Sequence, residues 1–191
     1  MTRIVAGVAG GRRIVVPPRG TRPTSERVRE ALFSALEAVV GVDGARVLDL
    51  YAGSGALGLE ALSRGATTAV FVESDRRAAE LLRRNATSLG LTGAVVHAVT
   101  VAAALATPPA EPFDIVLADP PYAVGGEELR AMLDRLVENG WLAPGAVVVL
   151  ERAVRSGEPD WPPALTPLRS RKYGDTVLHW AQFDDGTEWN E

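Results

Sequence analysis

The chain has 191 residues, 47% of them hydrophobic and 23% charged, with a formal net charge of −4 at pH 7. A chain of this length fits one domain, which would bury about 70% of the surface of its unfolded state. The sequence contains no cysteine, which excludes disulfides and thiolate nucleophiles. With only two histidines, a metal site is not expected. No apolar run nears the ~18 residues of a membrane helix, and no basic segment followed by an apolar one opens the chain, so we expect a cytoplasmic protein.

Positive charge is concentrated at the start of the chain. Residues 1–30 hold seven arginines and two glutamates, a net charge of +5, whereas the other 161 residues hold thirteen basic and twenty-two acidic side chains, a net charge of −9. A local basic segment can contact phosphates even when the mean charge of a protein is negative. The alternative is that these arginines only solvate the surface of a hairpin.

The predicted elements begin with a small β-hairpin. Residues 4–6 and 13–16, which are apolar except for Arg13 and are joined through Gly7 and Gly11, are typical of two short strands that need support from the main body. Thr24 or Ser25 then caps a predicted helix that ends near residue 40.

From residue 46 onward, apolar strands alternate with helices. Near-continuous apolar strands separated by helices indicate a parallel sheet that is covered on both faces. Two further strands, 166–172 and 176–183, predict a closing hairpin. The other predicted strands are 46–50, 68–73, 94–99, 113–118 and 146–151, and the predicted helices are 56–64, 75–89 and 126–138.

A glycine-rich turn follows the strand 46–50. Gly53, Gly55 and Gly58 match the dinucleotide pattern G-x-G-x-x-G, and Glu73 lies about twenty residues further on, so an oxidoreductase is the first interpretation. Asp49 argues against it, because a carboxylate at this strand end would repel a pyrophosphate. A ligand with a cationic amino group would instead be attracted, and S-adenosylmethionine carries an ammonium, a sulfonium and a ribose diol but no phosphate.

We therefore predict an S-adenosylmethionine site at this turn, with Glu73 accepting the ribose hydroxyls. A purely structural role for Glu73 remains open, because an acid at a helix start is favoured by the helix dipole. Thr24 is assigned to the methionyl end of the cofactor, with a helix N-cap as the equally weighted alternative. The residues assigned to cofactor binding are Thr24, Asp49, Tyr51, Ala52, Gly53, Ser54, Gly55, Glu73 and Ser74.

The segment Asp119-Pro120-Pro121-Tyr122 follows the strand 113–118 and is assigned to catalysis. Each proline fixes φ and lacks an N–H, so the backbone there cannot join a ladder and its carbonyls stay free. An exocyclic amine held at this ledge can donate to the Asp119 carboxylate, while the Tyr122 ring stacks on the attached base. The alternative is a tight turn with a core tyrosine. With Asp49 and Glu73, Asp119 places an acid at the carboxyl ends of three strands, where open α/β sheets bind ligands.

Several segments together carry a resemblance to a known family. The chain resembles, over essentially its whole length, the RsmD-type bacterial 16S ribosomal RNA guanine-N2 methyltransferases. The matching segments are Arg3-Ile4-Val5-Ala6-Gly7, Gly11-Arg12, residues 22–33, residues 49–66, Asp119-Pro120-Pro121-Tyr122 and residues 172–176.

The resemblance implies a Rossmann-like S-adenosylmethionine-dependent methyltransferase fold, with a seven-stranded, mostly parallel sheet and an antiparallel C-terminal hairpin. It also implies methyl transfer to N2 of one guanine in 16S ribosomal RNA, in an assembled or assembling 30S subunit. The expected parts are an N-terminal hairpin extension at 1–22, a methyltransferase domain at 23–184 and a disordered tail at 185–191. Relatives often present an acid to adenine after the strand 94–99, where this chain has Thr100.

The residues predicted to contact RNA are Arg12, Arg13, Arg22 and Lys172. Two other functions remain open at this point. An adenine-N6 methyltransferase acting on DNA also carries Asp-Pro-Pro-Tyr, although 191 residues leave no visible target-recognition domain. A ribosome-assembly factor could bind cofactor and RNA without catalysing a reaction.

Overall fold

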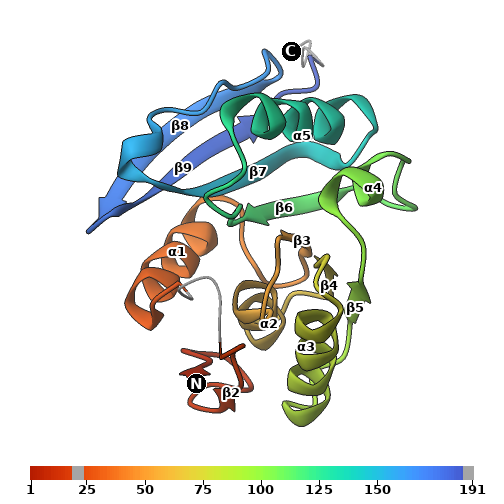
Figure 1. Cartoon of the computed structure of the whole chain (residues 1–191), viewed down its shortest axis with the longest axis vertical. Helices are drawn as coiled ribbons and strands as arrows, with labels where there is room; N and C mark the ends of the chain where they lie inside the picture. The colour runs from red at the N-terminus through yellow and green to blue at the C-terminus, as the bar shows by residue number, and fades with distance from the viewer. Residues whose placement is uncertain (19–23, 187–191) are drawn as a thin grey trace.

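A computed structural model describes residues 1–18 and 24–186, in which helices cover both faces of one seven-stranded sheet and a small hairpin precedes it (Figure 1). The strands are β1 (Thr2–Arg3), β2 (Arg13–Ile14), β3 (Arg46–Leu50), β4 (Thr68–Val72), β5 (Ala94–His97), β6 (Phe113–Ala118), β7 (Leu142–Ala153), β8 (Leu165–Tyr173) and β9 (Thr176–Phe183). The helices are α1 (Glu26–Val39), α2 (Ala56–Ser63), α3 (Arg76–Ser88), α4 (Val101–Leu105) and α5 (Gly126–Glu138), with a 3₁₀ turn at Val154–Ser156.

The strand order of the main sheet is β5-β4-β3-β6-β7-β9-β8, and β9 pairs antiparallel with both of its neighbours. The other strands are parallel. The predicted fold class is therefore confirmed. Because the chain leaves β3 in one direction and returns to β6 on its other side, the order reverses between β3 and β6, and the carboxyl ends of these strands form the expected ligand crevice.

Successive side chains along the central strands pack alternately into two separate hydrophobic cores. Val47, Ile115 and Val149 face the core beneath α1, α2 and α3. Leu48, Val116 and Leu150 face the opposite core, beneath α4 and α5. This period of two on strands that are buried on both faces explains why they read as continuous apolar runs.

The predicted N-terminal strands 4–6 and 13–16 are wrong in their bounds. The two strands are Thr2–Arg3 and Arg13–Ile14. The amides of Val5 and Ala6 donate instead to the Glu60 carboxylate on α2, at 2.7 and 3.1 Å. The amide of Val15 likewise donates to the Asn85 side chain on α3, at 3.0 Å. At Val5, Ala6 and Val15, hydrogen bonds to side chains of the main body thus take the place of the hydrogen bonds between strands that the apolar pattern predicted.

A buried cluster of charges joins the hairpin to helices α1 and α2. Arg29 is fully buried and donates to the Thr2 hydroxyl at 2.8 Å and to the Arg3 carbonyl at 2.6 Å. Glu60, also fully buried, lies 4.0 Å from Arg29 and accepts from Arg64 Nε at 2.9 Å. Burial lowers the pKa of Arg29, and the Glu60 carboxylate opposes this shift.

The other predicted strands and helices are found with ends displaced by at most a few residues, and α4 is an element that we did not predict. Arg22 and the tail residues 187–191 lie outside the described residues, so the expectations for them stay untested. Within residues 1–18 and 24–186, no helix is long and apolar enough to cross a membrane.

Candidate functional site

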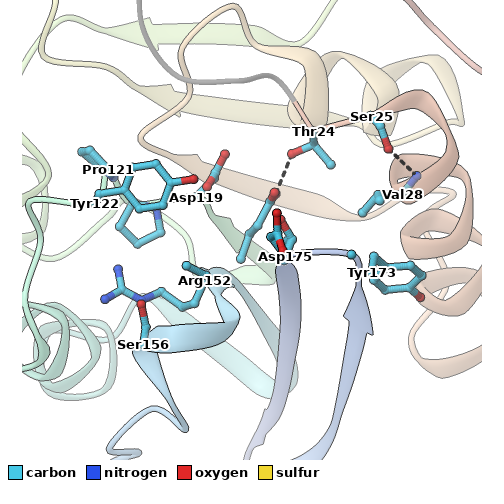
Figure 2. Close-up of a pocket in the computed structure, with 15 residues that line it drawn as sticks. Thr24, Ser25, Val28, Asp119, Pro121, Tyr122, Arg152, Ser156, Tyr173 and Asp175 are labelled. Atoms are coloured by element: carbon cyan, nitrogen blue, oxygen red, sulfur yellow. Dashed lines mark hydrogen bonds between the residues drawn. The ribbon is translucent and has the colours of Figure 1, made fainter.

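Two cavities meet at Asp119, at the carboxyl edge of the sheet. The β4-side cavity has a volume of about 490 Å³ and is lined by residues that include Tyr51, Glu73 and Thr100. The β7-side cavity has a volume of about 400 Å³ and contains Thr24 and Arg152 (Figure 2). Asp119 and Pro121 line both cavities, so the ledge after β6 forms the wall between them. Volumes of this size suit small ligands, for which pockets usually measure about 300–1,000 Å³.

The glycine turn after β3 uses its amides within the protein. Gly53 N–H donates to Glu73 Oε1 at 2.9 Å, and Gly58 N–H donates to Asp49 Oδ2 at 3.0 Å. The Gly55 amide donates to the Ala52 carbonyl at 2.9 Å. A dinucleotide site needs such amides for its pyrophosphate. Here two of the three point at carboxylates, which would repel a phosphate.

Positive φ angles shape the same turn. Gly53 has φ of +57°, and a Cβ there would meet no atom within 4 Å, so the absent side chain leaves the backbone open toward the cavity. Tyr51 also has φ of 57°, and among the described residues it is the only non-glycine residue with a positive φ. Backbone strain of this kind concentrates at functional sites, and Tyr51 and Gly53 both line the β4-side cavity.

Asp49 lies beneath the turn and lines neither cavity. Its carboxyl is 2% exposed, and burial raises its pKa from 3.8 to about 8, a shift that the hydrogen bond from Gly58 opposes. Without a bound cation, this group therefore holds its proton far more tightly than an ordinary aspartate. A cationic ligand above the turn would stabilise the ionised form.

The buried Asp49 carboxyl predicts a pH-dependent stability. Because the folded protein binds this proton more tightly than the unfolded chain, stability decreases as pH rises between about 4 and about 8. The slope due to one such group reaches about 1.4 kcal/mol per pH unit. We expect Asp49→Asn to lose less stability over this window than the unsubstituted protein, as measured by urea unfolding at pH 5, 6.5 and 8. Equal losses in both proteins would mean that another group causes the dependence.

Asp119 is half-buried, and no hydrogen bond within the described part of the chain reaches its carboxyl oxygens. Burial raises its pKa well above the usual range, and the nearby Glu151 carboxylate adds to the increase, while Arg152 opposes it. The Asp119 oxygens are not among the described side-chain atoms that are buried without a partner, so they remain accessible from the cavities that Asp119 lines. A carboxyl without a protein partner, at the junction of two cavities, suits a ligand that donates hydrogen bonds.

Three site residues on β7 and the turn after it were missed by our sequence reasoning. Glu151 accepts from the Thr24 hydroxyl at 2.5 Å and lines the β7-side cavity beside Arg152. Arg155 places its guanidinium 5.2 Å from the ring centre of Tyr122. The signal for Glu151 was present, because it ends the predicted strand 146–151 as Asp119 follows 113–118. It is the fourth acid at a strand end.

The assigned site residues divide into two groups. Those that line a cavity are Thr24, Tyr51, Gly53, Glu73, Ser74, Asp119, Pro120, Pro121 and Tyr122. Those that line neither are Asp49, Ala52, Ser54 and Gly55 in the turn, and Arg12, Arg13 and Lys172 elsewhere. Tyr122 is 77% exposed, so the alternative of a core tyrosine is wrong.

Thr24 and Thr100 sit at two different boundaries of the site. Ser25, not Thr24, caps α1, and the Thr24 hydroxyl is bonded to Glu151. Thr100 caps α4 through a 3.1 Å bond from the Ala103 amide and also lines the β4-side cavity. Thr100, just before α4, thus lines the cavity at the position where the resemblance implies an acid.

Arg12 has a structural role. Its guanidinium donates to the carbonyls of Ser88 at 2.5 Å and Leu89 at 3.1 Å, at the C-terminal end of α3. Arg13 is exposed on β2 and is not engaged in this way. Figure 1 shows the hairpin at the opposite end of the molecule from α5 and the β8–β9 strands. Across the described ranges, no group of three acidic or histidine side chains could hold a metal ion.

The strand order with its antiparallel closing hairpin, and acids at neighbouring strand ends, define a Rossmann-like fold of the S-adenosylmethionine-dependent methyltransferase class. The chain belongs to the family described as Conserved hypothetical protein 95, which matches residues 2–182. The resemblance to RsmD-type methyltransferases is thereby confirmed.

Several relatives are similar over most of their length. Ribosomal RNA small subunit methyltransferase D of Escherichia coli K12 is 43% identical over 179 residues, which cover 92% of this chain and 86% of that protein. The solved structure of the putative methyltransferase yhhF from Escherichia coli has a TM-score of 0.85 and 36% identity, covering 96% of this chain and 98% of that one. An RNA methyltransferase from Salinibacter ruber, solved with S-adenosyl-L-homocysteine, has a TM-score of 0.64 at 18% identity. The match covers 88% of this chain and 98% of that one, and it shows the shared fold alone.

Proposed function

We propose that this protein transfers a methyl group from S-adenosylmethionine to the exocyclic N2 of one guanine in 16S ribosomal RNA. The observation that carries the proposal is the position of Asp119, which lines both cavities and has no hydrogen-bonding partner in the described part of the chain. A donor in the β4-side cavity and an acceptor base in the β7-side cavity would meet at this carboxylate. The names of the Escherichia coli and Haemophilus influenzae relatives support ribosomal RNA of the small subunit as the substrate.

The β4-side cavity fits the cofactor better than it fits a dinucleotide. Glu73 lines the cavity and Asp49 lies beneath the glycine turn, and both take up turn amides that a pyrophosphate would need. The two oxygens of Glu73 accept from the amides of Gly53 and Asp75, which orients the carboxylate to accept hydroxyls of a ribose as well. Thr100 and the start of α4 lie at the same cavity, on the side assigned to the adenine.

S-adenosylmethionine, when bound, supplies an electrophilic methyl group on a sulfonium. The amine of guanine is a poor nucleophile because its lone pair is delocalised into the ring, so the protein acts mainly by alignment. Alignment of this kind can contribute about 7–11 kcal/mol in favourable cases. Asp119, accepting one N2–H, would orient the lone pair and stabilise the positive charge that develops on nitrogen.

The target base must leave any stem to reach Asp119, since an amine in a base pair cannot approach this ledge. Extruding a base costs a few kcal/mol, and stacking on an aromatic ring returns about 1–3 kcal/mol. Tyr122 offers a ring that is 77% exposed beside Asp119. The Arg155 guanidinium already lies over this ring, so a stacked base would occupy its other face or displace the arginine toward a phosphate.

One assay tests the proposal directly. Tritiated methyl transfer to deproteinised 16S RNA and to 30S subunits, each lacking the modification, should label at least one of them. Nucleoside analysis should then find the label on N2 of guanine. Label on adenine N6, labelling of DNA, or no transfer with calorimetric binding of dinucleotides would refute the proposal.

A second test addresses the basic N-terminus. We expect Arg13→Ala to weaken RNA binding and to reduce the slope of log affinity against log salt by about one, because one phosphate contact is lost. Cofactor affinity should not change. Arg46→Ala serves as a control, since Arg46 on β3 is engaged within the protein by an ion pair with Glu111 at 3.1 Å and should not contact RNA. Equal salt slopes for Arg13→Ala and the unsubstituted protein would leave the hairpin arginine with a solvation role only.

A further inference from the structure

Glu151 stands beside Asp119 at the carboxyl edge of the sheet. In the parallel pair β6–β7, Ala118 is in register with Leu150, so Asp119 and Glu151 are the next residues along the two neighbouring strands. Both line the β7-side cavity, and only Asp119 also lines the β4-side cavity. Glu151 therefore belongs to the acceptor side of the site and not to the side assigned to the cofactor.

One oxygen of Glu151 is already oriented by the protein. Oε2 accepts the Thr24 hydroxyl at 2.5 Å, and the hydrogen bonds of the described residues leave Oε1 for another donor. Figure 2 shows Thr24 and Asp119 facing this part of the cavity. Thr24 directly precedes Ser25, the N-cap of α1, and its hydroxyl orients the Glu151 carboxylate through this hydrogen bond.

Asp119 and Glu151 are two half-buried carboxyl groups in one cavity, and their mutual repulsion is relieved when a ligand brings hydrogen-bond donors to them. The positive charge of Arg152 favours the ionised form of Asp119, and Arg152 Nη2 donates to the Val124 carbonyl at 3.0 Å. Guanine offers two adjacent donors on one edge, N1–H and N2–H. Adenine and cytosine instead place an unprotonated ring nitrogen, an acceptor, next to their amine. A pair of carboxylates thus matches guanine and mismatches the other two amino bases.

We propose that Glu151 reads the target base by accepting N1–H of guanine, while Asp119 accepts N2–H of the same base. This inference rests on the proposed function and adds a specificity determinant to it. Asp119 serves the reacting amine, whereas Glu151 selects the purine that carries a proton at N1. Thr24 acts as a positioning residue, because it holds the second oxygen of Glu151.

The test compares guanine with 2-aminopurine at the modified position, in whichever RNA or subunit substrate proves active. 2-Aminopurine keeps the N2 amine but has an acceptor at N1. A lost hydrogen bond to a charged group should lower kcat/KM of the unsubstituted protein for 2-aminopurine by about 10- to 100-fold. In Glu151→Gln the side-chain amide can donate to N1 of 2-aminopurine. The ratio of kcat/KM for guanine to that for 2-aminopurine should therefore fall to near one or below it. Asp175→Asn, an exposed carboxyl that lines the same cavity, should keep the original preference.

The outcomes separate this inference from the proposed function. If the unsubstituted protein methylates both bases equally, or if Glu151→Gln keeps the original preference, Glu151 does not read N1. If the unsubstituted protein fails to methylate N2 of guanine at all, the proposed function itself is wrong. Calorimetry with S-adenosylmethionine should give unchanged affinity for Glu151→Gln. Thr24→Val offers a second variant should Glu151→Gln fail to fold, and its preference for guanine should fall as the carboxylate loses its orientation.

Discussion

Replacing Asp119 with asparagine is expected to lower kcat for methyl transfer by about 10²–10³-fold, the usual loss when one group that stabilises transition-state charge is removed. Asparagine keeps the shape of the side chain but carries no charge to balance the cation that develops on the amine. The group lies at the junction of the two cavities, so both substrates should still bind. Single-turnover rates with saturating cofactor and RNA measure the effect on the chemical step, apart from binding.

The matched control for Asp119 is Asp114, at the other end of the same strand. Asp114 accepts from the Arg46 amide at 2.9 Å at the amino edge of the sheet, far along β6 from the cavities. Asp114→Asn should therefore keep kcat. If Asp119→Asn retained full activity, the carboxylate would not act in the reaction. If cells carrying Asp119→Ala lost the methyl group on the RNA, the protein would act as an enzyme. If it were an assembly factor that catalyses no reaction, Asp119→Ala would leave its role in subunit assembly unchanged.

Local pattern was sufficient for most of the fold. The strands Arg46–Leu50 and Phe113–Ala118 and the helix Gly126–Glu138 match their predicted bounds, because each is a clear apolar or amphipathic run with turn residues at both ends. The helix Val101–Leu105 was missed, because five small apolar residues give no periodic signal. The order of the strands was not predicted, because periodicity along the chain does not encode which strands are neighbours.

The candidate site was predictable where acids end strands, and unpredictable where contacts bridge distant segments. Asp49, Glu73 and Asp119 follow the rule that ligands bind at carboxyl ends of parallel strands. Glu151 obeys the same rule and was overlooked. That Arg12 binds the end of α3, and that Asn85 joins Val15 to Ser54 through bonds of 2.9 to 3.1 Å, depends on tertiary placement, which no local pattern encodes.

Removing the Glu60 carboxylate should have the largest effect on stability. Glu60→Ala leaves Arg29 fully buried without its counter-charge and leaves the amides of Val5 and Ala6 without acceptors. Breaking a buried pair in this way usually costs about 3–5 kcal/mol. Urea unfolding at pH 7 should therefore give a much lower free energy of unfolding, and the hairpin should become sensitive to proteases before the rest of the chain.

An exposed pair on α3 provides the control for this loss. Glu80 pairs with Arg84 at 2.7 Å, but both side chains are more than half exposed, so Glu80→Ala should change stability by less than about 1 kcal/mol. A similar small change for Glu60→Ala would mean that water enters the cluster and solvates Arg29. A large change confined to Glu60 would instead show that the hairpin is held by a desolvated charge. The RNA contact proposed for Arg13 would then rest on a rigid support, because its strand pairs with the Thr2–Arg3 strand that Arg29 anchors.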